Sequence, residues 1–276
     1  MPGPCLSCDR RGEQGLTHCS IGQSCQDGVL GAGSREGSGG RLQTARFASF
    51  SSFLDGDAEA FNLLSGPVVR LRKGEVLRVE GAPNPDVYRL RAGWLACSVM
   101  TAEGRRQITK FHLPGDLVGM TSLAAHEATE TIEALSDAEV EIVPLDAFAE
   151  VFNNHPRVAA LLFLWSQEER VRLMHHLAVI GRMRSSKRVG ALLLLLYQRA
   201  QLSAPSRRTS FTMPLTQQDL ADATGMSIVH ANRSLKDLRE RGLVTVVDGL
   251  VKFRDLRGLI AYTEVPTVSK RRTDWI

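Results

Sequence analysis

The sequence lacks any long apolar run. The longest, residues 191–197 (ALLLLLY), falls far short of the roughly 20 residues that a helix needs to cross a bilayer. The N-terminus also lacks the charged-then-apolar pattern of a secretory signal. We therefore expect a cytoplasmic protein without membrane contact. Its five cysteines are then not expected to form structural disulfides, because that compartment keeps thiols reduced.

The patterns of common catalytic sites are missing too. The chain has no phosphate-binding loop, no Ser/His/Asp arrangement and no His-Glu-x-x-His pattern. Residues 37–40 have the composition of a flexible linker rather than of a nucleotide cradle. We therefore expect that the protein is not an enzyme.

Residues 216–241 (TQQDLADATGMSIVHANRSLKDLRER) are the most informative stretch, and they predict two short helices joined by a tight turn. Thr216 and Asp219 have the spacing of a capping box at the start of the first helix. Gly225 stands where the chain must turn, and Ser227 can cap the second helix. This pattern is typical of a helix-turn-helix, although an ordinary pair of packed helices would share it.

A helix-turn-helix presents the start of its second helix to the major groove of DNA. Arg233 can bond guanine, and Asn232 can bond adenine, each in a bidentate way. Lys236 and Arg239 are expected to meet phosphates, which carry no sequence information. The predicted DNA-contacting residues are Thr216, Gln217, Ser227, Val229, His230, Asn232, Arg233 and Lys236.

A hairpin and a charge asymmetry support this interpretation. Residues 243–247 (LVTVV) and 250–253 (LVKF) flank Asp248-Gly249, a strong hairpin signal that predicts a wing. From Arg182 onward 17 Lys+Arg stand against 8 Asp+Glu, a net of +9, whereas residues 1–181 hold 17 against 22, a net of −5. Such a division favours phosphate binding at one end of the molecule. We assign residues 185–276 to a winged helix-turn-helix domain, with a support helix at 185–203 and a short strand at 211–213.

Glycines and prolines interrupt residues 65–145 about every ten residues, which is the spacing of an all-β sandwich or barrel. We predict an antiparallel β-roll in a domain at 46–155, preceded by a cysteine-rich arm and flexible linker at 1–45. The fold class is then α+β. The predicted β-runs are 76–79, 87–90, 94–100, 107–112, 131–135 and 140–145.

Between these domains the pattern is that of a long helix at 156–184, with Pro156 suited to its first turn. A helix of about 25 residues spans nearly 40 Å, which is more than a small roll can cover. We therefore predict that its apolar stripe packs against a second copy of the chain, the alternative being a helix that lies wholly on the roll. The stripe follows steps of three or four and their sums, and consists of Leu162, Trp165, Leu173, Leu177 and Ile180.

Residues 111–119 (FHLPGDLVG) and 225–235 are specific motifs. With the order β-roll, long helix and winged helix-turn-helix, the chain resembles the Crp/Fnr family of bacterial transcription regulators over about residues 45–262. The resemblance implies a homodimer that binds a palindromic site in double-stranded DNA, with RNA polymerase as a partner. It also implies that Arg233 is the guanine-reading arginine of the family.

Three neighbours of Arg233 depart from the best-known family members. Asn232 and His230 replace their common residues, and Val229 stands where they usually have glutamate. Valine cannot accept a hydrogen bond from cytosine, but it can touch a thymine methyl group. We therefore expect a half-site that differs from the commonest one.

Cyclic-nucleotide-binding members of the family carry Gly-Glu near the phosphate and an Arg-Ser/Thr-Ala soon after. Here the matching stretch has Gly115-Asp116 and lacks the arginine, whose neighbourhood is occupied by Glu127 and Glu130. Acids beside a phosphate are electrostatically unfavourable. We therefore do not expect cAMP binding.

The N-terminal cysteines are the candidate sensor. Cys5, Cys8, Cys19 and Cys25 match the ligand count of an iron–sulfur cluster, such as 4Fe–4S, or of a structural zinc. The segment is otherwise too poor in apolar residues to build a core, so it needs a staple if it is ordered.

The stretch from Cys19 to Cys25 is similar to the cluster-binding arm of oxygen-sensing Fnr-type members, which use three arm cysteines and one in the roll. Leu16 stands where part of the usual cysteine pair would be, and Glu141 stands at the roll position. Cys5 and Cys8 would then supply the missing pair. Cys97 lies in a predicted strand and is expected to be a small core residue.

We thus predict a DNA-binding transcription regulator that responds to oxygen or redox state through an iron–sulfur cluster. One alternative keeps the DNA-binding function and replaces the cluster by zinc, by a thiol switch or by no metal, because soft thiolates suit both metals. An alternative of another class is a ligand-binding module that signals by protein contact.

Overall fold

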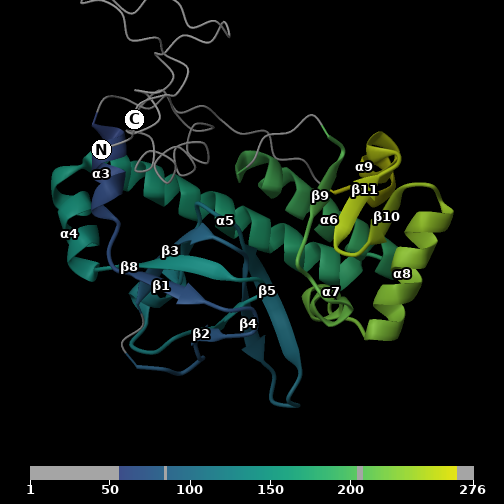
Figure 1. The fold of residues 1–276 in the computed structure, drawn as a ribbon, viewed down its shortest axis with the longest axis horizontal. Coiled ribbons are helices and arrows are strands. Elements are labelled where there is room, and N and C mark those ends of the chain that lie inside the picture. The colour runs from purple at the N-terminus through teal and green to yellow at the C-terminus, as the bar shows by residue number, and fades with distance from the viewer. Residues whose placement is uncertain (1–55, 84–85, 204–207, 266–276) are drawn as a thin grey trace, which may run out of the picture.

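The computed structural model describes residues 56–83, 86–203 and 208–265. In chain order these residues form a β-roll with short flanking helices, a long helix, and a C-terminal unit of helices around a small sheet (Figure 1). The predicted α+β class is confirmed. The predicted arm at 1–45, with its four cysteines, lies outside the described residues. Among the described helices, none is long and apolar enough to cross a membrane.

The β-roll is made of two four-stranded antiparallel sheets, with orders β1-β8-β3-β6 and β2-β7-β4-β5. Side chains of both sheets meet in one apolar core that includes Leu90, Cys97 and Ile132. Cys97 is fully buried there, as expected of a core residue. The strands are β1 Val68–Leu71, β2 Val76–Arg78, β3 Val87–Ala92, β4 Leu95–Met100, β5 Arg106–His112, β6 Leu117–Val118, β7 Thr131–Ala134 and β8 Ala138–Val143.

Each of the six predicted β-runs overlaps an observed strand, but the last run ends too late. The prediction extends it to Leu145, which instead begins helix α4 (Leu145–Asn154). Pro144 is the physical reason, because it has no N–H for a sheet ladder and stands as the extended N-cap of that helix. Helix α3 (Asp57–Leu63), strands β1 and β6, and the 3-10 helix η1 (Met120–Ala124) were not predicted from the sequence pattern.

Helix α5 (Pro156–Arg182) runs along the roll toward the C-terminal unit (Figure 1). Pro156 occupies its first turn, as predicted. The first half of the helix packs against α3 and α4 in a second core, which contains Phe61, Leu161 and Trp165. This half of α5 is therefore part of the interior of the unit formed by the roll and its flanking helices.

The structure corrects the first part of the predicted dimer stripe. Leu162 and Trp165 are 2% and 5% exposed because α3, α4 and the roll cover them, which leaves them no surface for a second copy. Leu173 and Leu177, farther along the same helix, are 49% and 63% exposed. Ile180 is partly buried. The stripe is thus one face of α5 that is buried in the first half of the helix and largely exposed in the second.

The C-terminal unit has the predicted support helix, short strand, helix pair and hairpin. Asp248 and Gly249 both take positive φ, 48° and 75°, as a tight two-residue hairpin requires. Its sheet has the order β10-β11-β9. A last helix, α9, was not predicted. The elements are α6 Ser185–Ser203, β9 Ser210–Thr212, α7 Gln217–Thr224, α8 Ile228–Glu240, β10 Val244–Val247, β11 Leu250–Phe253 and α9 Leu256–Thr263.

One apolar core joins this unit to the roll. Leu192, Leu193 and Leu196 of α6 belong to the same buried cluster as Ile108 and Phe111 of β5. Strand β5 therefore contributes to the interior of the C-terminal unit as well as to its own sheet.

Candidate nucleic-acid interface

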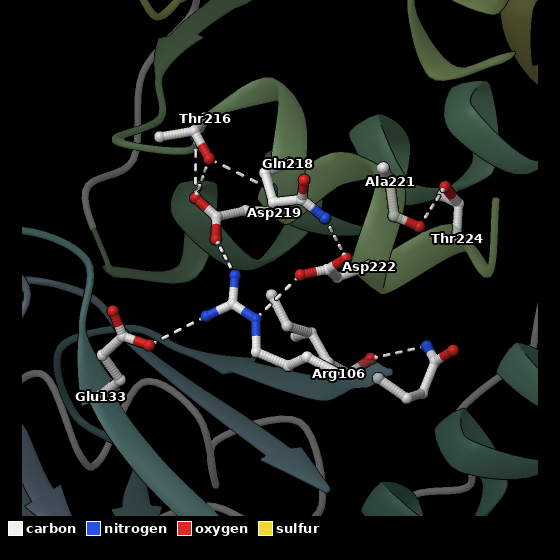
Figure 2. A network of polar contacts seen from close by, with 10 residues as sticks. Arg106, Glu133, Thr216, Gln218, Asp219, Ala221, Asp222 and Thr224 are labelled. Carbon is white, nitrogen blue, oxygen red and sulfur yellow. Dashed lines mark hydrogen bonds and ion pairs between the residues drawn. The ribbon is translucent and has the colours of Figure 1, made fainter. Parts of the chain in front are cut away.

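Helix α7 begins and ends as its sequence predicts. Thr216 Oγ1 accepts a hydrogen bond from Asp219 N at 3.1 Å, and Asp219 Oδ2 accepts one from Thr216 N at 2.8 Å (Figure 2). These two bonds form the predicted capping box. Gly225 ends the helix in the left-handed conformation, with φ 65°, so the chain turns sharply toward α8.

Helix α8 buries one face against its own unit and leaves the other in solvent. Ser227 caps it by accepting a hydrogen bond from His230 N at 3.4 Å. Its buried side chains are Ala231, Ser234 and Leu238. The exposed side chains include Val229, His230, Arg233, Lys236 and Arg239. The predicted base-reading and phosphate-binding residues therefore share this outward face.

The predicted DNA-contacting residues differ in their exposure and in the partners that their side chains already have. Arg233 is exposed, and the described part of the chain offers its guanidinium no ion pair. Asn232 is half-buried and donates to Gln217 Oε1 at 2.8 Å, which ties α8 to α7. Lys236 lies 3.6 Å from Glu240, and this exposed pair leaves it available to a phosphate.

Two exposed residues of the C-terminal unit were not among the predicted DNA contacts. Ile228 is 39% exposed next to Val229 at the start of α8. Lys252 is exposed on the wing, where Val251 and Phe253 point inward. The period-2 alternation of the hairpin could have identified Lys252 from the sequence.

Glu141 does not have the environment of a metal ligand. It is 7% exposed, and it forms ion pairs with Arg89 and, at 3.2 Å, with Arg91 Nη1. These two guanidinium groups already satisfy the carboxylate. Over residues 56–83, 86–203 and 208–265, no three His, Cys, Asp or Glu side chains group as a metal site. The roll position implied by the resemblance is thus an arginine-bound carboxylate.

A cavity of about 570 Å³ lies between β5, α5 and α6. Glu130 lines it, and Thr129 beside it donates to Thr121 Oγ1 at 2.9 Å. Basic residues line other parts of the wall, but three of them are paired with acids. These pairs are Lys110–Glu169, Arg172–Glu168 and Arg199–Asp116.

One of these pairs is buried where the roll meets α6. Arg199 donates to Phe111 O at 2.7 Å and also binds Asp116, which in turn accepts from Leu113 N at 2.9 Å. Asp116 is fully buried and Arg199 is 4% exposed. A guanidinium of the C-terminal unit is therefore fixed to the turn that follows β5.

The charged wall perturbs two titratable groups. Burial raises the pKa of Glu169, but Lys110 and Arg199 outweigh it and bring the pKa from 4.5 to about 2. Burial and the neighbouring Lys110 lower the pKa of His112 below its usual 6.5, although Asp116 partly offsets them. Glu169 is consequently ionised and His112 neutral at pH 7.

Comparisons with known proteins identify the class to which this fold and interface belong. Residues 187–262 match the model of the Crp-like helix-turn-helix domain, and residues 68–155 match that of the cyclic nucleotide-binding domain. The chain is 30% identical over 192 residues to the transcriptional regulatory protein btr of Bordetella pertussis, covering 69% of this chain and 78% of that protein.

The chain is also 25% identical over 193 residues to the anaerobic regulatory protein of Haemophilus influenzae, covering 70% of this chain and 75% of that protein. Among solved structures, FixK2 from Bradyrhizobium japonicum shares the fold, with a TM-score of 0.64, 23% identity and coverage of 74% of this chain and 99% of that one. The chain belongs to the Crp/Fnr family of transcription regulators. It is a DNA-binding regulator and not an enzyme.

Buried His112 makes the stability of the folded chain sensitive to acid. Its folded-state pKa lies below its unfolded value, so the unfolded chain binds the proton more readily, and stability falls as the pH drops below about 6.5. We expect the urea midpoint of the wild type to fall between pH 7.5 and 5.5, and that of His112→Gln to fall less. His176, whose pKa is also lowered by burial, accounts for part of the remaining slope. Equal slopes for His112→Gln and the wild type would contradict the assignment.

Proposed function

We propose that two copies of this chain form a symmetric dimer that inserts both α8 helices into the major groove of a palindromic DNA site. We further propose that the dimer works with RNA polymerase and responds to oxygen or redox state. The observation that carries the proposal is the outward face of α8, where Arg233 stands exposed beside Val229 and His230.

Arg233 is the proposed guanine reader. A guanidinium presents two parallel donors that match the O6 and N7 acceptors of guanine. Val229, 57% exposed, can touch a thymine methyl group, and His230 stands beside it. Asn232 can reach adenine once its bond to Gln217 is exchanged for one to the base. Four further residues are proposed to approach the DNA backbone. They are Thr216 and Gln217 at the start of α7, Ser227 at the start of α8, and Lys236.

The exposed half of α5 is the proposed dimer interface. Leu173 and Leu177 lie there with Met174, which is outside the predicted stripe and is 60% exposed, and Phe163 in the first half of the helix is also 57% exposed. Large apolar side chains repeated along one helix favour burial against another apolar surface. The occupant we propose is the same helix of a second copy, because a palindromic site requires two-fold symmetry.

The proposed sensor is the set of Cys5, Cys8, Cys19 and Cys25, outside the described residues. Since Glu141 is bound by two arginines and Cys97 is buried in the roll, all four ligands would come from the arm itself. Four thiolates suit an iron–sulfur cluster, which supplies oxygen-sensitive redox chemistry when bound. The name of the Haemophilus relative, an anaerobic regulatory protein, supports this signal over others. We propose no cAMP binding, because the stretch after Gly115-Asp116 lacks the arginine that would neutralise a cyclic phosphate, and Glu130 of that stretch lines the cavity.

Arg233→Ala tests base reading. We expect it to cost about 1–3 kcal/mol of DNA affinity and to relax base preference at one position per half-site. Lys236→Ala is the matched control, because loss of a phosphate contact weakens all sequences alike and flattens the salt dependence. Binding to a library of half-site variants measures both effects. An unchanged base preference in Arg233→Ala would refute the assignment.

Leu177→Glu tests the dimer. A carboxylate in the middle of an apolar interface loses its hydration, so we expect subunit dissociation at micromolar concentration in analytical ultracentrifugation. Leu145→Glu is the control, because Leu145 is 56% exposed on α4 and lies outside the proposed interface. A monomeric wild type, or a Leu177→Glu variant as dimeric as the control, would exclude this interface.

Cysteine substitutions test the sensor. Protein purified without oxygen is expected to contain iron and sulfide and to absorb visible light, and Cys19→Ser or Cys25→Ser should lose these properties and bind DNA more weakly. Cys97→Ala is the control, since this thiol lies in the roll core. Zinc without iron would support the structural-zinc alternative. A metal-free wild type would eliminate both metal hypotheses.

A further inference from the structure

Arg106, the first residue of β5, connects the roll to the DNA-reading helices. Its Nη2 lies 2.6 Å from Asp219 Oδ1, and its Nε lies 2.8 Å from Asp222 Oδ2, both on α7. Its Nη1 lies 2.8 Å from Glu133 Oε2 on β7 of the roll. Figure 2 shows this single guanidinium between the carboxylates of the two units. We name this set of four residues the Arg106 network.

The network is strongly unbalanced in charge without its arginine. Three carboxylates surround one cation, so removal of Arg106 leaves acids of the roll facing acids of α7. Asp219 has two tasks, because its Oδ2 caps α7 while its Oδ1 binds Arg106. The position of Arg106 is therefore coupled to the start of the helix-turn-helix.

The Arg106 network holds the C-terminal unit with its reading face open. Val229, His230 and Arg233 remain exposed while α7 is bound to the roll. On the covalent path only residues 183–184 separate α5 from α6. In a dimer built on α5, the spacing of the two α8 helices is then set by how each C-terminal unit sits on its own roll.

Strand β5 also connects this network to the cavity. Residues 108–112 of the strand line the cavity, and Arg106 stands at the other end of the same strand. A displacement of the cavity wall would therefore be transmitted along this strand to α7.

We propose that Arg106 is a positioning residue. It holds the two α8 helices of the dimer at the spacing required for sequence-specific DNA binding. The inference rests on the proposed dimeric function. It assigns control of the spacing between the α8 helices to one contact between the roll and α7. Arg106 acts through Asp219 and Asp222 and makes no contact with DNA in this mechanism.

The first test compares adjacent arginines in the full-length protein. Arg105 is exposed and stands outside the network, so Arg105→Ala removes the same charge without removing the contact. We expect Arg106→Ala to bind a palindromic duplex about tenfold more weakly than Arg105→Ala, and the two to bind mixed-sequence duplex alike. Arg106→Lys, which keeps the charge with fewer directed donors, should be intermediate. Equal affinities of Arg105→Ala and Arg106→Ala for the palindrome would overturn the proposal.

Asp222→Asn provides a second test with an opposite electrostatic expectation. Removing a carboxylate near DNA should strengthen binding if charge alone decides, whereas loss of the Arg106 contact should weaken specific binding. We expect about a threefold loss, which does not add to the loss in Arg106→Ala. A gain in affinity, or additive losses, would overturn the proposal. Matching urea midpoints for Asp222→Asn and the wild type establish that the loss does not come from unfolding.

The outcome is separable from the proposed function. If Arg233→Ala loses base preference while Arg106→Ala and Arg105→Ala bind alike, only the positioning role fails. If Arg233→Ala and the wild type have the same base preference, the proposed reading function fails, and the positioning role fails with it.

Discussion

The docking of strand β5 on the C-terminal unit is the interaction on which the rest of the structure depends. Ile108 and Phe111 are buried in the same cluster as the leucines of α6. Fully burying such a side chain contributes about 1.5–3 kcal/mol, so separating the units would expose several of these contributions at once. Because the same strand belongs to the β2-β7-β4-β5 sheet, the roll cannot be repacked without consequences for the helix pair. The roll and the C-terminal unit therefore share one packed interior at this strand.

The polar contacts at the two ends of β5 make that docking specific. Arg199 from α6 binds Phe111 O and the fully buried Asp116 after the strand, while Arg106 binds α7 at its start. Buried ion pairs lose hydration on formation, so their attraction gives little net stability, whereas a pair that loses one partner is strongly penalised. Apolar contacts alone would tolerate sliding along β5. The two arginines restrict the C-terminal unit to one register on the roll.

Local signals made most of the fold predictable, and long-range contacts were the part that was not. Pro156, Asp248-Gly249 and the Thr216–Asp219 box each act through neighbours within a few residues, and the structure has the predicted element at each. The stripe of α5 also followed from periodicity, but periodicity cannot say what covers a face. Trp165 is covered by the chain's own roll, whereas Leu177 is not. The contact between Arg106 and Asp219 joins residues 113 positions apart and has no periodic signal.

The two environments of α5 explain how one helix can contact both the roll and the proposed partner. Its buried half, around Trp165, fixes α5 to the roll, and its exposed half, around Leu177, is left for the proposed partner. The C-terminal unit then follows after residues 183–184 and is held back against β5. In a dimer the separation of the two α8 helices therefore depends on two contacts in series, helix against helix and unit against strand. The affinity for a palindromic site depends on both contacts. A half-site displaced from its helix loses base contacts, whereas the attraction to phosphates remains. Any signal that alters either contact would change specific binding before it changed general affinity for DNA.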